Sequence, residues 1–179
     1  MKRSSLITLA ALVLILGAAA AATLVVYSHR EREKNSPAAQ LLSDTEHIYT
    51  DISGNPVKLS NYEGKVRVVA LWASWCPSCA SELRDLNALA ESYGNGLVVL
   101  AVNRKEPKET AQRFLKTVGD VPRITLIIDQ EDYFYRSVSG YAMPETIVYD
   151  TKGREVLHAR GEITREELEK AVQSANTAS

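Results

Sequence analysis

Two cysteines, Cys76 and Cys79, stand three positions apart just after a nearly unbroken apolar run at residues 66–71. Such a run fits a strand that is buried on both faces of a partly parallel sheet. The chain of 179 residues contains only these two cysteines, so neither has a distant thiol to bridge to. A disulfide that closes so short a loop removes little entropy from the unfolded chain. The pair therefore indicates chemistry, at the point where a central strand ends.

The residues after the pair have helical spacing. Apolar side chains recur on one face from Cys79 to Tyr93, and Gly94 follows where a helix end favours glycine. Residues 97–102 and 124–128 are typical of buried strands, with a helix around 111–118 between them. This alternation predicts an α/β fold with the cysteine pair at the N-terminus of a helix.

Further elements flank this centre. The turn-rich residues 51–56 lie between short apolar stretches and predict a hairpin over 48–59. A short helix is expected around 132–138, followed by antiparallel strands at 146–150 and 156–160 joined by a turn. Thr164, with Glu167 three residues later, predicts a capping box that opens a C-terminal helix.

The cysteine spacing suits thiol-disulfide exchange, in which a thiolate attacks a disulfide sulfur. A helix N-terminus stabilises the thiolate, so Cys76 is the expected nucleophile. Cys79 lies one turn deeper and is the expected resolving thiol. Pro77 is predicted at the first helical position, where a missing N–H does least harm. Trp75 would form an apolar flank beside the sulfur, unless it is ordinary packing.

The N-terminus carries an uncharged apolar segment from residue 6 to residue 27, about long enough to cross a membrane as a helix. We expect residues 1–27 to be a signal-anchor transmembrane helix, 28–43 a polar tether and 44–179 the folded domain. The Lys and Arg count slightly favours a cytoplasmic domain, but dithiol chemistry suits an oxidising compartment. The prediction is a single-pass protein of the inner (cytoplasmic) membrane with a periplasmic domain. The alternative is a cleaved signal peptide, with small residues for a peptidase at 18–22.

Several stretches of this sequence resemble one family. Residues 51–59, Gly64-Lys65 and residues 72–76 follow the order found in thioredoxin-like proteins of the TlpA, ResA and CcmG (DsbE) type. The resemblance covers most of the part after the tether. It implies a thioredoxin fold with an N-terminal β-hairpin extension and a central helical insertion, and no cofactor beyond the Cys76–Cys79 disulfide.

Met143-Pro144-Glu145-Thr146 matches the place where this family carries a cis-proline facing the cysteines. In such proteins the backbone beside the proline pairs with an incoming peptide as an added strand. The resemblance therefore implies that Trp75, Pro77, Met143, Pro144 and Glu145 contact the substrate. The alternative is a simple turn proline ahead of a strand.

The cysteine motif and Pro-Glu-Thr are most similar to the CcmG branch, whose anchored, extracytoplasmic members reduce apocytochrome c. The implied partners are client protein thiols and disulfides, and an upstream membrane dithiol donor. Ala70 replaces the buried acid that thioredoxins carry six residues before the first cysteine. Another group, Glu145 or an ordered water, would then accept the proton of Cys79.

Other functions remain open. A general periplasmic disulfide reductase or oxidase and a peroxiredoxin-like peroxidase are alternatives, and a non-catalytic binding module is disfavoured by the intact pair. A zinc site lacks ligands, because His47 and His158 are single and are expected to be surface residues. The net charge of -1 is mixed along the chain and indicates no nucleic-acid partner. Charge runs at 104–106 and 165–167 are expected to be solvated faces.

Overall fold

The computed structural model describes residue 23 and residues 47–177 of the chain. Residues 47–177 all belong to one unit, Gln40–Ser179. The predicted signal-anchor helix at 1–27 and the tether at 28–43 therefore lie outside the described residues, apart from Thr23. Within the part that is described, no helix combines the length and the apolar character needed to cross a membrane.

A mixed sheet of seven strands, in the order β2-β1-β5-β4-β3-β6-β7, forms the centre of the described part. Its strands β3, β4 and β5 are parallel to one another, and the remaining neighbours are antiparallel. The strands are β1 (Ile48–Asp51), β2 (Pro56–Lys58), β3 (Val66–Trp72), β4 (Leu97–Arg104), β5 (Ile124–Asp129), β6 (Glu145–Tyr149) and β7 (Glu155–Arg160).

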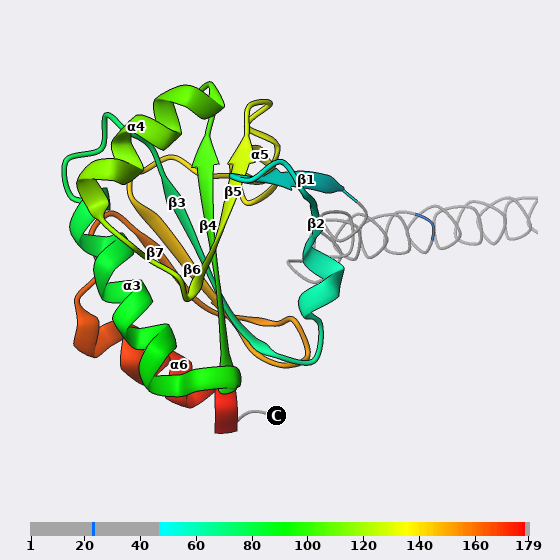
Figure 1. The fold of residues 1–179 in the computed structure, drawn as a ribbon. Helices are drawn as coiled ribbons and strands as arrows, with labels where there is room; N and C mark the ends of the chain where they lie inside the picture. Colours follow the sequence, from blue (N-terminus) through cyan, green and yellow to red (C-terminus); the bar gives the residue numbers. More distant parts are fainter. Residues whose placement is uncertain (1–22, 24–46, 178–179) are drawn as a thin grey trace, which may run out of the picture. The chain divides into compact units, whose positions relative to one another are not determined.

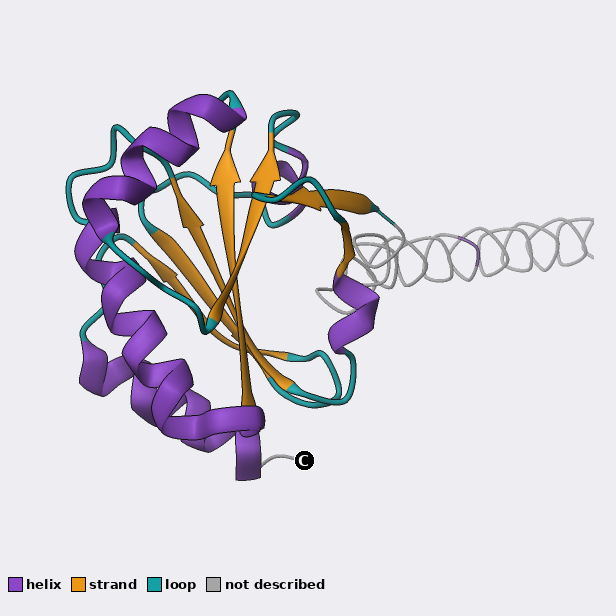
Figure 2. Cartoon of the chain, in the orientation of Figure 1, coloured by secondary structure: helices purple, strands orange, loops and turns teal. Residues whose placement is uncertain are grey.

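Helices cover both faces of this sheet (Figure 1). Three of them, α3, α4 and α6, pack on one face around a large apolar cluster that includes both cysteines. The helices α5 and η1 contribute Phe134 and Leu59 to a second cluster on the other face. Figure 2 shows this layering. The helical elements are η1 (Leu59–Tyr62), α3 (Cys79–Tyr93), η2 (Gly94–Gly96), α4 (Lys108–Val118), α5 (Tyr133–Ser137) and α6 (Arg165–Thr177).

The strand that leads to the cysteines, β3, is buried along its whole length. All seven residues of β3 are buried, because β4 and β6 flank the strand while helices cover it. This confirms the buried strand predicted at residues 66–71 and extends it to Trp72. Because β3 is enclosed on all sides, it fixes the position at which the cysteine loop begins.

The predicted hairpin is present as β1 and β2. Its turn is held by the carboxylate of Asp51, whose Oδ1 accepts the backbone N–H groups of Ser53 at 2.8 Å and Asn55 at 2.7 Å. Strand β1 also pairs with β5, so the hairpin extends the main sheet.

The C-terminal elements agree closely with the sequence. Strands β6 and β7 pair as the predicted antiparallel neighbours. The capping box is formed, because the N–H of Glu167 donates to Thr164 Oγ1 and the N–H of Thr164 donates to Glu167 Oε2. Gly94 ends α3 with a φ of 56°, in the left-handed region that favours glycine.

Candidate active site

The two cysteines lie where the buried strand β3 gives way to helix α3. They are joined as a disulfide, with their Cα atoms 5.5 Å apart. Cys79 is the first residue of α3, and Cys76 lies in the preceding turn, where its N–H donates to the carbonyl of Ala73 at 3.1 Å. Cys76 is only 2% exposed and Cys79 is fully buried. An incoming thiolate must therefore displace neighbouring groups before it reaches either sulfur.

Pro77 does not occupy the first helical position. Helix α3 begins at Cys79, so Pro77 belongs to the turn before the helix, and the prediction was wrong by two residues. The reason is that the first helical hydrogen bond runs from the N–H of Glu82 to the carbonyl of Ser78. The N-terminal N–H groups of α3 nevertheless begin directly after the turn that holds Cys76.

The loop before β6 reaches the same end of the sheet. Strand β6 runs antiparallel to β3, with Glu145 opposite Leu71, so the start of β6 lies beside the end of β3. The Met143–Pro144 peptide bond in this loop is cis, as the resemblance implied. Met143 packs against the apolar clusters on both faces of the sheet. Trp75, on the cysteine loop, is 60% exposed.

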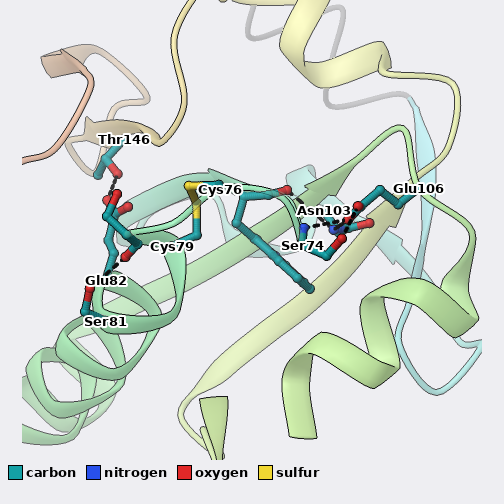
Figure 3. Close-up of a disulfide and its surroundings, with 10 residues drawn as sticks. Ser74, Cys76, Cys79, Ser81, Glu82, Asn103, Glu106 and Thr146 are labelled. Carbon is teal, nitrogen blue, oxygen red and sulfur yellow. Dashed lines mark hydrogen bonds between the residues drawn. A yellow bond between two sulfur atoms is a disulfide. The ribbon is translucent and has the colours of Figure 1, made fainter. Parts of the chain in front are cut away.

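A carboxyl group, that of Glu82, stands on the disulfide side of α3 (Figure 3). Thr146 of β6 donates its hydroxyl to Glu82 Oε1 at 2.5 Å. Burial, with the negative charges of Glu162 and Asp85, raises the pKa of Glu82 to about 7 against the lowering effect of the Thr146 hydrogen bond. A carboxyl group with this pKa exchanges protons readily at neutral pH.

Sequence reasoning missed Glu82, although a signal was present. Glu82 lies three residues after Cys79 and four before Leu86, so it interrupts the apolar face of α3. A charged residue on the buried face of a helix needs a partner or a function.

Glu145 is not the group that accepts the proton of Cys79. Side chains alternate along a strand, so Glu145 points to the opposite sheet face from Thr146 and Glu82. Its carboxylate is fully buried and lies 2.5 Å from Nε2 of His158 and 3.3 Å from Nε of Arg160. We therefore correct one prediction: the Glu145 side chain does not face the cysteines, so it is not placed to accept the proton of Cys79. The side chain of His158 is also buried rather than a surface group.

The loop between β4 and α4 holds the cysteine loop from the other side (Figure 3). Glu106 is 8% exposed, and its carboxylate accepts the N–H of Ser74 at 2.9 Å and Nδ2 of Asn103 at 2.7 Å. The expectation that residues 104–106 are a solvated face was wrong at Glu106. Its partner Ser74 lies 32 positions back in the chain, beyond the reach of local pattern reading.

A cavity of about 190 Å³ opens beside this site. Its lining joins the cysteine turn, the cis-proline, the carboxyl of Glu82 and the segment before α6. The lining residues are Ser78, Ser81, Glu82, Asp85, Leu86, Pro144, Glu162, Ile163, Arg165 and Leu168. Glu82 thus has a route to solvent that does not pass through the disulfide.

Neither of the two histidines that the structure describes forms a metal site with the cysteines. His158 is paired with Glu145, and the ring of His47 stacks on that of Tyr133 with centroids 4.0 Å apart. Across residues 47–177, no group of three or more His, Cys, Asp or Glu is arranged to hold a metal ion.

Comparison with known proteins places this geometry in a family. The family model described as Redoxin matches residues 30–177. The chain belongs to the Redoxin family. The Redoxin protein is 29% identical to the thiol-disulfide oxidoreductase ResA of Geobacillus kaustophilus over 174 residues, which cover 97% of each chain. It is 32% identical to the thiol:disulfide interchange protein DsbE of Haemophilus influenzae over 98 residues, 55% of this chain and 51% of the relative.

Solved structures confirm the fold of this Redoxin protein. A secreted Mycobacterium tuberculosis disulfide oxidoreductase superimposes with a TM-score of 0.65 at 18% identity, covering 74% of this chain and 98% of the other. A thioredoxin family protein from Chlorobium tepidum TLS superimposes with a TM-score of 0.63 at 20% identity, covering 72% and 92%. The predicted thioredoxin-like α/β fold is therefore confirmed. So is the predicted enzyme class, a thiol-disulfide oxidoreductase of the ResA and DsbE type.

Proposed function

We propose that this Redoxin protein reduces disulfides of client proteins, with Cys76 as the nucleophile and Cys79 as the resolving thiol. One arrangement carries the proposal: a cysteine pair at the start of α3, with cis-Pro144 on the neighbouring loop and the carboxyl of Glu82 on the same helix. The N–H groups at the start of α3 stabilise a thiolate at Cys76 in the reduced protein.

The first step is attack of the Cys76 thiolate on a client disulfide. The client S–S bond breaks, one client sulfur leaves as a thiolate, and a mixed disulfide joins Cys76 to the other client sulfur. The leaving thiolate takes a proton from solvent. No net electron transfer is complete at this stage, because the client remains bonded to Cys76.

The second step is attack of Cys79 on the sulfur of Cys76. Cys79 must first lose its proton, and Glu82, three residues along α3 with a pKa of about 7, accepts it. The Cys76–Cys79 disulfide forms and the client leaves with two reduced sulfurs. Two electrons have then passed to the client, and a dithiol donor must reduce the protein again.

Client binding uses the backbone beside the cis-proline. An extended client segment lies along Met143 and Pro144 as an added strand, and the exposed Trp75 on the cysteine loop offers a further contact. The turn around Pro77 and the cavity next to Ser78 border the same path.

The location and the client are part of the proposal and rest on the resemblance of the sequence to the CcmG branch. On that resemblance we propose an extracytoplasmic domain on a single-pass anchor in the inner membrane, with residues 1–27 as the span and 28–43 as the tether. The resemblance also supports apocytochrome c as a client and a membrane dithiol donor upstream. These assignments go beyond the enzyme class and belong to the proposal.

The proposal is tested by trapping. The Cys79→Ser variant should accumulate mixed disulfides on Cys76 in cells, which mass spectrometry identifies. The Cys76→Ser variant is the matched control and should trap far fewer. Apocytochrome c among the trapped proteins supports the haem-maturation role, whereas a varied set of clients without it points to a general reductase. Equal trapping by both variants would reject Cys76 as the nucleophile.

The direction of electron transfer is tested separately. The equilibrium of the Cys76–Cys79 pair with glutathione gives its reduction potential. A value near -120 mV, like that of a disulfide-forming catalyst, would reject the reductant assignment.

A further inference from the structure

An exposed tyrosine stands on the cis-proline loop. Tyr141 is 76% exposed, more than any other large hydrophobic side chain among the described residues, and lies three positions before Pro144. Single exposed aromatic residues are common and mean little alone. The position of Tyr141 beside the cis-proline and the contacts that fix its loop indicate a role in client binding.

The ring of Tyr141 lies over the guanidinium of Arg160, which is paired with Glu145. The guanidinium carbon of Arg160 is 5.0 Å from the ring centroid, and Nε of Arg160 is 3.3 Å from Glu145 Oε1. Arg160 lies opposite Glu145 in the β6–β7 pair, and His158, two residues earlier on the same face, contacts the same carboxylate oxygen. The Glu145 carboxylate is fully buried and the Arg160 side chain is 31% exposed, so the carboxylate holds the guanidinium in place beneath the Tyr141 ring.

The backbone on both sides of Tyr141 is anchored as well. The N–H of Gly140 donates to the carbonyl of Tyr135 at 2.8 Å, and the N–H of Ala142 approaches Glu145 Oε2 at 3.4 Å. A Cβ at Gly140 would lie 2.4 Å from the Tyr135 ring, so the loop packs tightly there. The loop thus presents an exposed ring from a fixed backbone, which lowers the entropy cost of binding.

We propose that Tyr141 is a specificity-determining client contact, which selects extended polypeptides that carry a large apolar or aromatic side chain next to the reacting cysteine. This inference rests on the proposed function and deepens it. Cys76 is only 2% exposed, so a client must engage the surrounding surface before its sulfur reaches Cys76. Trp75 on the cysteine loop and Tyr141 on the cis-proline loop supply two exposed aromatic rings for that contact, on loops at the same end of β3 and β6.

The two exposed aromatic side chains indicate which kind of client residue binds beside them. Tyr and Trp offer large contact area at low conformational cost, and they pack best against apolar or aromatic groups. The client segment is continuous with the strand added along Met143 and Pro144, so its residue beside the cysteine comes within reach of this loop.

The test uses two disulfide-bonded peptides that differ only in having Phe or Ser beside the cysteine, and glutathione disulfide as a small substrate. In the full chain, Tyr141→Ala should lower the second-order rate constant for the Phe peptide by about tenfold and change the Ser peptide and glutathione rates by less than about twofold. Tyr141→Phe should keep the selectivity. Ile48→Ala, which removes an exposed side chain on β1, is the matched control and should change nothing.

A second readout is independent of redox chemistry. The Phe peptide with its cysteines replaced by serine is titrated against each variant by NMR, and only Tyr141→Ala should weaken its binding. Failure of the wild type to reduce any disulfide while this binding difference persists would reject the proposed function but keep the docking surface. Equal losses for both peptides and glutathione, or no loss of selectivity, would overturn the role of Tyr141. So would a change in self-association as the sole effect of Tyr141→Ala.

Discussion

The carboxylate of Glu106 accepts hydrogen bonds from both the backbone N–H and the hydroxyl of Ser74, at 2.9 Å and 2.5 Å. Ser74 lies two residues before Cys76, and Glu106 lies in the loop that follows β4. One buried carboxylate therefore joins the loops that follow two adjacent parallel strands. Asn103 Nδ2 is a third donor to the same group.

Glu106→Ala should destabilise the oxidised protein by about 2–4 kcal/mol, because it leaves buried donors of Ser74 and Asn103 without an acceptor. Chemical denaturation measures this loss. Glu109→Ala, at an exposed position in the first turn of α4, is the control and should cost less than about 1 kcal/mol. Similar losses in the two variants would contradict the anchoring role of Glu106.

The raised pKa of Glu82 makes stability depend on pH. Its pKa is about 7 in the folded protein against 4.5 for the unperturbed group, so the folded state binds more protons between these values. Stability contributed by this group should therefore fall as pH rises from about 4.5 to about 7 and stay level above that.

Glu82→Gln should remove this dependence. The substitution should raise the free energy of unfolding by about 2 kcal/mol more at pH 8 than at pH 4. This figure allows for partial exposure of the side chain. Denaturation midpoints across this pH range give the measurement. Glu91→Gln, at an exposed site on the same helix, should leave the pH profile unchanged. An identical profile in wild type and Glu82→Gln would show that Glu82 titrates normally.

The same substitution should slow release of the client. Without a carboxylate to accept the Cys79 proton, Glu82→Gln should reduce the rate of mixed-disulfide resolution by about 10²-fold at pH 7. Stopped-flow measurement with a preformed Cys76 mixed disulfide follows this step directly. The wild-type rate should show an inflection near pH 7 that the variant lacks, and persistence of the inflection would assign it to another group.

Gly140→Ala should destabilise the fold by about 1–3 kcal/mol through overpacking. The added Cβ would lie 2.4 Å from the Tyr135 ring and 2.9 Å from Glu145 Oε2. The Tyr135 ring has little freedom to move, because the guanidinium of Arg104 stacks 3.3 Å from its centroid. Thermal unfolding measures the loss.

Gly96→Ala is the matched control for this change, because a Cβ at Gly96 meets no atom within 4 Å. The two substitutions add the same methyl group to a glycine, so a difference in stability reports the packing around Gly140. A loss at Gly96 as large as that at Gly140 would rule out the close approach as its cause.

Local patterns in the sequence predicted most of the framework. The apolar run before the cysteines, the helical spacing after them and the Thr164 capping box each depend on residues a few positions apart, and each is present in the structure. The cis bond at Pro144 came from family resemblance, because X-Pro bonds alone rarely reveal their isomer. The start of α3 was misplaced because the turn at Cys76 and Pro77 precedes the first helical hydrogen bond.

The sequence by itself determined that two thiols meet at the start of a helix, since three-residue spacing and a single apolar run specify that locally. Only the tertiary structure decided which carboxyl groups surround them. Strand alternation turns Glu145 away and pairs it with His158, while the packing of α3 on β6 brings Glu82 to Thr146. Such choices depend on strand register and on contacts between distant segments, which no local spacing encodes.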